Sequence, residues 1–583
     1  MKDVWPPRTP AYVQQGLVNM KNEMKRWVVA AVVILVGVEA WVYRGLNGDV
    51  WINAPATEEY VSVKKTDPNG TGEPVKLCTS GYEVWRQQHE IDGVNVNESP
   101  RCEPDNPWAV AAVVKGTNNV SMKTLMQTRL ASDAVIKSDD LDGDGDPDVI
   151  HIKLEVSELN GSSPDGDRFL PTYEIAPGVQ PGLWVFTPKT RGMAAINLFS
   201  YEAIRDLRAP SPVIRVEQGD IVKITLENTH YLPHTIHLHG VDHPYVNAEG
   251  EGNDGVPLTD GRPVLPGDRK TYTLKPRQTG TMFYHCHVQT AKHLMMGLQG
   301  MFVVEENRPN NWLQTLNVGA GYVRHSSVAV KASYEHEYDL HYQSIDNDLN
   351  SIIQKANDPR LIARRMNREY DITDATSDYF LLNGRSFPYT LRESIIVVRP
   401  DENVKLRVLN GQENVLSLHT HGHKATITHL DGIERPRAQQ VIRDVYDLSS
   451  AQRMDLRLST QNDGLHSYGP GVWLFHNHAE KGITTNGRGP GGDISMVVYR
   501  SYLENDGMPK LQGVGVDRFL DPEYNAGNIP IWEGSEATSL LGEAGSVEPD
   551  AWRVVMLGLV FGIIVGLLSL LRTSVAGPGR GMK

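Results

Sequence analysis

Short runs of alternating apolar and polar residues, separated by turn residues, recur along most of the chain. Examples are residues 213–216, 221–226 and 395–398. Side chains alternate between the two faces of a strand, so this pattern is typical of strands that each bury one face. Two such regions, residues 165–306 and 307–502, predict an all-β protein with two β-sandwich domains.

Three segments depart from the strand pattern. Residues 345–368 are polar and tolerate a helix, which predicts an insertion inside the second domain. Residues 503–551 are rich in Gly and acidic residues and predict a linker. Residues 44–164 have no pattern that assigns them to a fold.

Two longer apolar runs, at residues 27–43 and 552–572, predict transmembrane helices at the two ends of the chain. Basic residues flank the outer end of each run, so the positive-inside rule predicts that residues 1–26 and 573–583 are cytoplasmic. The protein is then expected at the cell membrane, with its domains on the extracytoplasmic side. A cleaved signal peptide is the alternative for the first run, and a core helix for the second.

Length and charge narrow the class of protein and partner. At 583 residues the chain is long enough for two or three hydrophobic cores. Its formal net charge of -14 argues against nucleic acid as a partner, because phosphate binding requires a basic surface.

The candidate chemistry centres on residues 285–296, which read His-Cys-His-Val-Gln-Thr-Ala-Lys-His-Leu-Met-Met. In a strand, His285 and His287 point to one face and Cys286 to the other. Cys286 can therefore bind one metal ion while its neighbours bind others. Thiolate with imidazole is the ligand set of a blue copper site, and clusters of imidazoles suit copper or zinc.

Three more histidine clusters accompany this stretch: His234-Thr-Ile-His-Leu-His239, His419-Thr-His-Gly-His423 and His476-Asn-His478. For 20 His in 583 residues, chance gives roughly 0.7 His-x-His pairs, whereas the chain has five. The order of these clusters, together with Asp254-Gly255, resembles the four copper-binding motifs of multicopper oxidases. The resemblance covers about residues 165–502 and implies that both domains are cupredoxin-like Greek-key sandwiches.

The resemblance also implies the copper ligands. One blue, or type 1, copper would be bound by His234, Cys286 and His293. A trinuclear cluster of one type 2 and two type 3 coppers would be bound by eight imidazoles, those of His237, His239, His285, His287, His419, His421, His476 and His478. The implied content is four coppers per chain. Asp254 matches an acidic residue that the family uses to pass protons to the cluster, and an ordinary turn aspartate is the alternative.

Two departures from the family pattern matter. Leu298 holds the usual axial position of the blue site and cannot coordinate copper, which tends to raise the copper potential; Met296 is the alternative axial ligand. In the second domain Asn477 holds the place of the cysteine, so that domain cannot build a blue site. A single blue site in the first domain resembles two-domain multicopper oxidases and copper nitrite reductases, and this resemblance implies a homotrimer.

The residues outside the copper motifs support fewer inferences. Once Cys286 is assigned to a metal, Cys78 and Cys102 remain for one disulfide, with two free thiols as the alternative. Asn-x-Ser/Thr sequons occur at Asn69, Asn97, Asn119 and Asn160 and are compatible with a glycosylated surface. His230 and His243 flank the first motif and are interpreted as surface or substrate-side residues.

An acidic run matches the start of a calcium-binding loop. Carboxylates alternate at Asp140, Asp142, Asp144, Asp146 and Asp148, with Gly145 at the sixth place. His151 stands where an EF-hand has its bidentate Glu, so the match is to a short calcium-stabilised turn. A solvated acidic loop without an ion is the alternative.

The favoured function is therefore an oxidase that takes single electrons from a reducing substrate, a phenol or a metal ion, and reduces dioxygen to water. A copper nitrite reductase and a non-catalytic blue-copper electron-transfer protein are the alternatives. The three predict different copper contents per chain, because they use four coppers, two coppers and one copper respectively.

Overall fold

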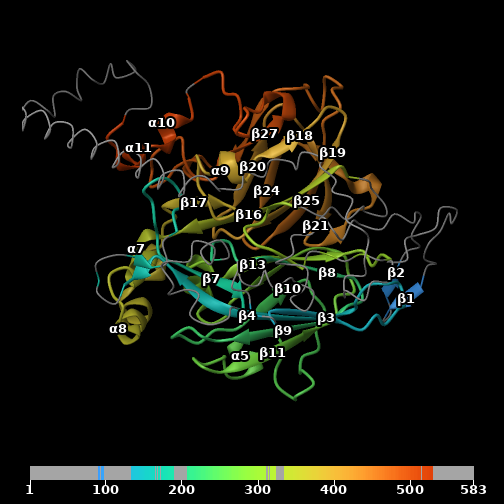
Figure 1. The fold of residues 1–583 in the computed structure, drawn as a ribbon, viewed down its shortest axis with the longest axis vertical. Coiled ribbons are helices and arrows are strands. Elements are labelled where there is room, and N and C mark those ends of the chain that lie inside the picture. Colours follow the sequence, from blue (N-terminus) through green and yellow to red (C-terminus); the bar gives the residue numbers. More distant parts are fainter. Residues whose placement is uncertain are drawn as a thin grey trace, which may run out of the picture. The chain divides into compact units, whose positions relative to one another are not determined.

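The computed structural model describes residues 131–189, 207–323 and 334–529, with a few single or paired residues left out of these ranges. It also describes the backbone of two short strands, β1 (His89–Ile91) and β2 (Val94–Val96) (Figure 1). All of these residues belong to the unit Ser62–Lys583. Among the described residues, no helix is long and apolar enough to cross a membrane. The predicted spans, and the predicted disulfide of Cys78 and Cys102, lie outside the described residues.

The first sandwich packs two sheets around one core. One sheet has the order β10-β12-β13-β8-β14, with β8 (Val213–Glu217), β10 (His237–His239), β12 (Gly280–His285), β13 (Gln299–Glu305) and β14 (Leu316–Asn317). The other has the order β11-β9-β4-β3, and β7 also pairs with β4; its strands are β3 (Val135–Ser138), β4 (Val149–Leu159), β7 (Leu183–Pro188), β9 (Ile221–Glu227) and β11 (Arg269–Leu274). Every second residue of β4 from Ile150 to Val156 is buried, so one face of this strand meets the core.

The second sandwich repeats this arrangement. Its larger sheet has the order β15-β16-β19-β25-β21-β22, with β17 and β23 pairing at its sides; the strands are β15 (Gly321–Tyr322), β16 (His336–Ile345), β17 (Tyr379–Leu382), β19 (Asn403–Asn410), β21 (Ala425–Leu430), β22 (Ile433–Glu434), β23 (Val441–Arg443) and β25 (Arg453–Ser459). Its smaller sheet has the order β18-β27-β26-β20-β24, with β18 (Ile396–Val398), β20 (Leu416–Thr420), β24 (Val445–Leu448), β26 (Val472–Asn477) and β27 (Ser495–Tyr499).

The order of the central strands is the same in both sandwiches, while the edge strands differ. The parallel pairs β4–β9 and β8–β13 of the first sandwich correspond to the parallel pairs β16–β19 and β18–β27 of the second. Likewise, β12 lies between β10 and β13, as β26 lies between β20 and β27. The prediction of two all-β sandwich domains related by an internal repeat is therefore confirmed.

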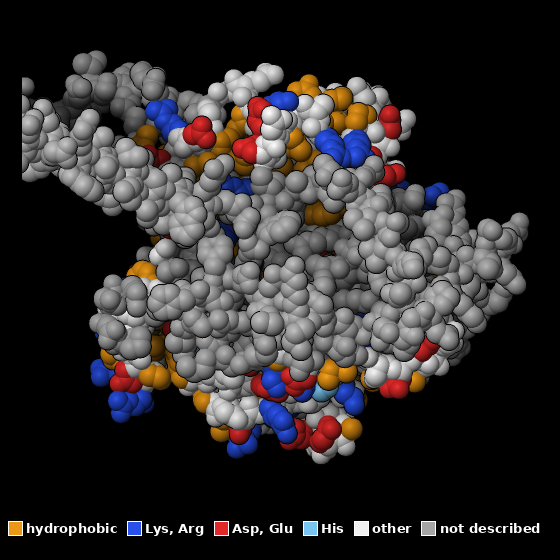
Figure 2. Space-filling view, in the orientation of Figure 1, with side chains coloured by type: hydrophobic (Ala, Val, Ile, Leu, Met, Phe, Trp, Pro, Cys, Tyr) orange, Lys and Arg blue, Asp and Glu red, His pale blue; other side chains and the backbone are white. Residues whose placement is uncertain are grey.

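The remaining elements are short. They are β5 (Gly161–Ser162), β6 (Phe169–Leu170), α5 (Pro257–Asp260), α6 (Thr290–Met295), η6 (Ile372–Asp374), α9 (Thr390–Glu393), η7 (Arg437–Gln439), η8 (Glu480–Ile483), η9 (Arg500–Tyr502), α10 (Asp517–Leu520) and α11 (Pro522–Ala526). On the described part of the face in Figure 2, acidic and basic side chains are interspersed.

The predicted insertion of the second domain is helical. It contains α7 (Asn347–Asn350), η4 (Ser351–Ile353), α8 (Pro359–Arg364) and η5 (Arg365–Glu369). Leu349, Ile353 and Met366 belong to the same buried cluster as Trp184 and Cys286 of the first sandwich. The insertion therefore covers the first domain's core beside its cysteine.

Three features differ from what the sequence suggested. Residues 131–163 lay in the unassigned segment, but they supply β3 and β4 of the first sandwich. The predicted linker does not begin at 503, because Phe519 and Tyr524 are buried against the second domain. Asn160 is fully buried, and its amide donates to the carbonyl oxygens of Tyr173 and Pro181 at 2.6 and 2.8 Å, so this sequon is not a surface site.

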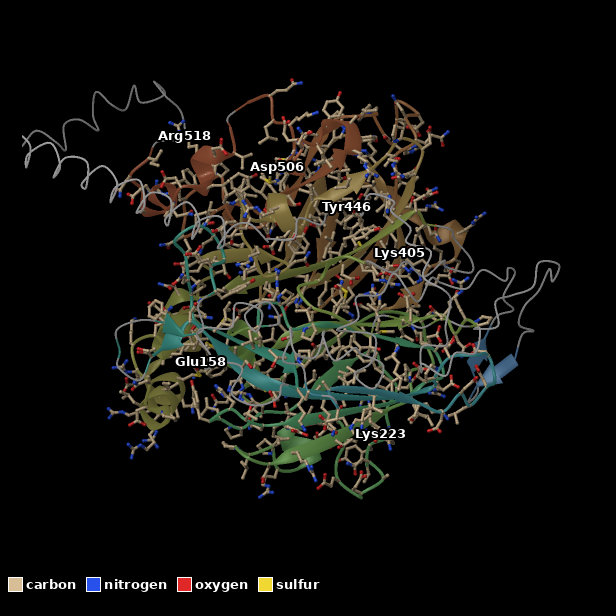
Figure 3. All side chains as sticks on the ribbon, viewed as in Figure 1. Glu158, Lys223, Lys405, Tyr446, Asp506 and Arg518 are labelled. Carbon is tan, nitrogen blue, oxygen red and sulfur yellow. The ribbon has the colours of Figure 1, made fainter. Side chains whose placement is uncertain are left out.

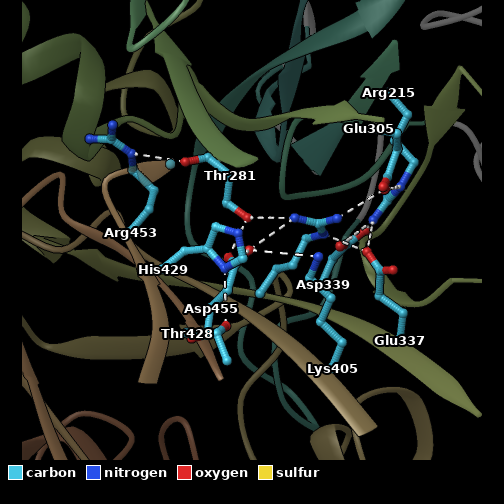
Figure 4. A network of polar contacts seen from close by, with 12 residues as sticks. Arg215, Thr281, Glu305, Glu337, Asp339, Lys405, Thr428, His429, Arg453 and Asp455 are labelled. Carbon is cyan, nitrogen blue, oxygen red and sulfur yellow. Dashed lines mark hydrogen bonds and ion pairs between the residues drawn. The ribbon is translucent and has the colours of Figure 1, made fainter. Parts of the chain in front are cut away.

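A buried ionic network joins the two sandwiches (Figure 4). Arg215 of β8 makes two hydrogen bonds of 2.7 Å to the carboxylate of Asp339 on β16. Arg407 of β19 donates to Glu305 of β13 at 3.0 Å and to Asp455 at 3.1 Å. Buried charges persist when they are paired and hydrogen-bonded, so these contacts fix how the two sandwiches pack.

Candidate metal centre

The predicted blue-site residues come together in a buried pocket of the first sandwich. Cys286 directly follows β12, and its Sγ lies 3.6 Å from Nδ1 of His234 and 3.3 Å from Nδ1 of His293. The ligand atoms of the three residues all lie within 4.8 Å of one another. The exposed fraction is 0% for Cys286 and His234 and 2% for His293. One thiolate and two imidazoles converging in a dry pocket match the donor set of a blue copper site.

Burial sets the protonation of these ligands. It lowers the pKa of His293 to about 3 and the pKa of His234 well below its ordinary value, so both imidazoles are neutral. It raises the pKa of Cys286 to about 11, so the protein alone favours the thiol. A bound cation would replace the thiol proton.

The two candidate axial residues are both fully buried in the same apolar cluster as Cys286. The backbone amide of Cys286 donates to the carbonyl oxygen of Leu298 at 3.0 Å, which holds Leu298 beside the cysteine. The choice between Leu298 and Met296 as the axial neighbour of the metal stays a prediction.

A set of four imidazoles lies next to the blue site, at the ends of β10 and β12. The strand register pairs His237 with His285, and Nε2 of His239 lies 3.0 Å from Nε2 of His285. The rings of His285 and His287 lie 5.6 Å apart. Burial lowers the pKa of His239 to about 4 and that of His285 to about 3. Neutral imidazoles this close together are suited to binding metal ions.

The second sandwich carries a matching set at the ends of β20 and β26. The register pairs His419 with His476, and Nε2 of His421 lies 3.2 Å from Nε2 of His476. The ring of His478 lies 5.7 Å from that of His476. Unlike the first set, this one is open to solvent, because His421 and His478 are exposed.

The two sets do not meet within the chain. Among the described residues, no hydrogen bond or ring contact joins a histidine of the first set to one of the second. All eight predicted imidazoles are therefore gathered, but into two separate groups of four.

Asp254 contacts the first set of imidazoles through His237. Its Oδ1 lies 3.3 Å from Nδ1 of His237, which also donates to the backbone oxygen of Asp254 at 2.7 Å. This contact leaves Nε2 of His237 free to bind a metal. On its other side, Oδ1 of Asp254 lies 3.1 Å from Nε2 of His243. His243, interpreted from sequence as a surface or substrate-side residue, thus extends a chain of proton-bearing groups.

In the second sandwich, Asn477 fills the place of the cysteine and is fully engaged. Its Nδ2 donates to Asp493 at 3.3 Å, and its Oδ1 accepts from the backbone amides of Ser417 and Ala479 at 3.3 and 3.0 Å. An amide tied in this way offers no thiolate for a blue site.

The acidic run folds into a turn held by its own carboxylates. Asp140 accepts from the amides of Gly143 and Gly145 at 2.7 and 3.0 Å. Oxygens of Asp140, Asp142 and Asp148 lie within 4.8 Å of one another. Asp144 has a buried oxygen, Oδ2, without a hydrogen-bond partner.

Sequence comparisons relate segments of both sandwiches to multicopper oxidases. Residues 204–309 and 362–487 match two profiles described as multicopper oxidase. Together the two matches contain all eleven predicted copper ligands. The chain therefore carries two multicopper oxidase domains in a two-domain cupredoxin-like layout, which supports a copper-dependent oxidoreductase.

The chain is also similar to several named proteins. The chain is 23% identical over 269 residues to copper resistance protein A of Escherichia coli, an alignment that covers 44% of this chain and 42% of the relative. It is 27% identical over 205 residues to multicopper oxidase mco of Staphylococcus haemolyticus, covering 34% of this chain and 35% of the relative. Among solved structures, the blue copper oxidase from Nitrosomonas europaea aligns with a TM-score of 0.44 and 22% identity, covering 64% of this chain and 94% of that one. The chain spans less than half the length of the curated relatives it matches.

Proposed function

We propose that the protein is a copper oxidase that couples one-electron oxidation of a reducing substrate, a phenol or a metal ion, to the four-electron reduction of dioxygen to water. The observation that carries this proposal is the continuity of the ligands. Cys286 of the thiolate site lies between His285 and His287 of the first imidazole set, so one short segment connects the two. Bound copper would supply the electron transfer at both sites.

The chain's own residues would perform three tasks. The buried pocket of His234, Cys286 and His293 excludes water from the electron-accepting site. The peptide bonds from Cys286 to His285 and His287 give electrons a covalent route to the imidazole set. Asp254, 28% exposed at its side chain and in contact with His237, is placed to pass protons from solvent.

Oxygen uptake by purified, copper-loaded protein tests this function. Phenols, ferrous, cuprous and manganous ions and a small redox protein would each be offered as the donor. We expect uptake that matches one O₂ for every four electrons given by at least one donor. Nitrite reduction without oxygen uptake would instead support the copper nitrite reductase, and donor oxidation without either would support an electron carrier.

We further propose that the trinuclear cluster forms between subunits of a homotrimer. The two imidazole sets do not contact each other within one chain, and a head-to-tail ring brings unlike faces together at every interface. Exposed apolar side chains lie close in sequence to both sets: Tyr245 is 63% exposed and Leu258 93% near Asp254, and Ile442 is 46% exposed near the His419 contact Asp444. Such residues are typical of surfaces that a partner covers.

Mixing two inactive variants tests the interface. A subunit with His237→Ala and His239→Ala has a damaged first set, and a subunit with His419→Ala and His421→Ala has a damaged second set. Co-assembly should restore part of the oxygen uptake, because some interfaces pair two intact sets. A fully active monomer in sedimentation at catalytic concentration would contradict the trimer.

We also propose that residues 27–43 and 552–572 anchor the protein and that its sandwiches face the extracytoplasmic side, on the strength of their apolar length and flanking basic residues. Impermeant labels added to intact cells should then react with the sandwiches and with neither terminus. Labelling of Lys583 from outside would contradict this topology.

The acidic turn supports a calcium proposal of the same kind. Asp140, Asp142 and Asp148 gather the oxygen ligands that calcium prefers, and Asp144 adds a buried oxygen without a partner. The fifth predicted ligand, Asp146, instead accepts from the backbone amide of Asn311 at 2.7 Å. Calcium should raise the melting temperature of the protein relative to EGTA, and Asp140→Asn should abolish that difference. Asp447→Asn, an exposed acid on β24, serves as the control. An equal melting temperature in calcium and EGTA would sink the proposal.

A further inference from the structure

A second histidine stands directly behind a blue-site ligand. Nδ1 of His230 lies 2.8 Å from Nε2 of His234, and His230 is 6% exposed. His234 turns its Nδ1 toward Cys286, so with copper bound at Nδ1 the proton of His234 lies on Nε2 and is donated to Nδ1 of His230. His230 then carries its own proton on Nε2.

The proton on His230 faces a carboxylate. Nε2 of His230 lies 3.8 Å from Oε2 of Glu158, a residue near the end of β4 (Figure 3). The same oxygen accepts hydrogen bonds from Tyr231 Oη at 2.5 Å and from Trp184 Nε1 at 3.0 Å. Two hydrogen bonds therefore end on one oxygen of Glu158, and Nε2 of His230 faces the same oxygen beyond hydrogen-bond distance.

Aromatic packing holds this arrangement rigid. The ring of His230 lies 3.9 Å from that of Tyr231 and 4.9 Å from that of Trp184. Trp184 is fully buried, and its ring also lies 5.9 Å from His234 and 5.3 Å from His293. Both blue-site imidazoles therefore rest against the indole that Glu158 orients.

We propose that His230 and Glu158 are positioning residues of the blue copper site: His230 fixes the orientation of His234, and Glu158 transmits its negative charge through His230 to that ligand. The proposal rests on the proposed copper chemistry. It names residues that the copper motifs do not contain.

The electrostatic consequence has a definite sign. His230 hydrogen-bonds to His234 and has the carboxylate of Glu158 3.8 Å behind it, so this pair makes His234 a stronger electron donor, as partners behind metal-bound histidines do. Negative charge near the site favours the oxidised, more positive copper over the reduced one. Glu158 therefore lowers the reduction potential, opposing the increase expected where Leu298 leaves the axial position without a donor.

The test measures the reduction potential of the blue site in copper-loaded protein, by spectroelectrochemical titration of its visible absorption band. Glu158→Gln removes the charge but keeps the hydrogen-bonding shape, so the potential should rise. Glu158→Asp should restore part of the difference. Glu174→Gln is the matched control, because Glu174 also accepts from a tyrosine hydroxyl and a side-chain amide, at 3.0 and 3.1 Å, but does so away from the blue-site ligands. The reduction potential of the blue site should be the same in Glu174→Gln as in the unaltered protein.

Variants of His230 separate positioning from charge. His230→Gln can accept the proton of His234 but gives no imidazole link to Glu158, so the blue absorption should persist while the potential rises. His230→Phe removes the acceptor, and copper affinity should fall about 10–100-fold. An unchanged potential in both Glu158→Gln and His230→Gln, with copper bound, would overturn the proposal.

The outcome is independent of oxygen reduction. The potential and the absorption need only one copper at Cys286, so they can be measured even if the protein consumes no oxygen. Failure of the proposed oxidase function would instead appear as absent oxygen uptake in the unaltered protein.

Discussion

The two sandwiches of this chain share the order of their central strands but differ in the metal chemistry that they can support. In the first, His237 pairs with His285, and the next residue is Cys286. In the second, His419 pairs with His476, and the next residue is Asn477. The fold thus places a side chain at the same strand end twice, and the identity of that side chain decides whether a thiolate site exists. The repeated backbone therefore positions the residue, and the side chain alone determines whether copper can be bound by a thiolate.

The cysteine position gives the largest expected effect. Cys286→Ser should abolish the intense visible absorption and the oxygen uptake while leaving copper at the imidazole sets. Asn477→Cys should not create a second blue site, because Thr484 stands seven residues later, where His293 follows Cys286. Copper analysis and absorption spectra check both variants, and colour that survives in Cys286→Ser would show that the pocket is wrongly assigned.

The next largest effect is expected at the acidic residue that contacts each set of four imidazoles. His237 contacts the side chain of Asp254, whereas His419 donates to the backbone oxygen of Asp444 at 2.8 Å. Asp254→Asn should lower turnover about 100-fold, the size of one lost proton-transfer group. Asp444→Asn keeps its backbone contact and should leave turnover close to normal. Equal losses in the two variants would argue against a special role for Asp254.

The ionic network between the sandwiches tests whether they fold as one unit. Arg407 is 1% exposed at its side chain and contacts Glu305 and Asp455. Arg407→Leu should destabilise the protein by about 3–5 kcal/mol, because it leaves carboxylates buried without their partner. Arg262→Leu, which breaks an exposed pair with Asp268, should cost about 0–1 kcal/mol. Chemical unfolding of both variants measures the difference.

The smallest expected effect concerns Asp493, whose carboxyl accepts a hydrogen bond from Asn477. Burial raises the pKa of Asp493 to about 7. The folded protein holds the Asp493 proton more tightly than the unfolded chain does. The free energy of unfolding therefore falls as the pH rises from the ordinary pKa of an Asp toward 7. Asp493→Asn should therefore be more stabilising at pH 8 than at pH 5, as followed by thermal unfolding. An equal effect at both values would mean that Asp493 is not held protonated.

The sequence predicted the elements that repeat and the residues that carry metal chemistry. Alternating strands and paired His-x-His motifs are local patterns, so the two sandwiches, the pocket of His234, Cys286 and His293 and the contact of Asp254 could be predicted. Residues 131–163 could not be placed, because their pairing with β9 depends on contacts distant in sequence. The roles of Glu158 and Trp184 could not be predicted either, because neither lies in a motif and only the fold brings them to His230.

The copper content of the assembled and the dissociated protein tests the central claim most directly. The claim is that the first sandwich alone holds a blue site and that the eight imidazoles complete their cluster only between subunits. Four coppers per chain in the trimer, falling to about one when the subunits are separated, is the expected result. Four coppers retained by a sedimenting monomer, or a trimer that never exceeds two per chain, would contradict it.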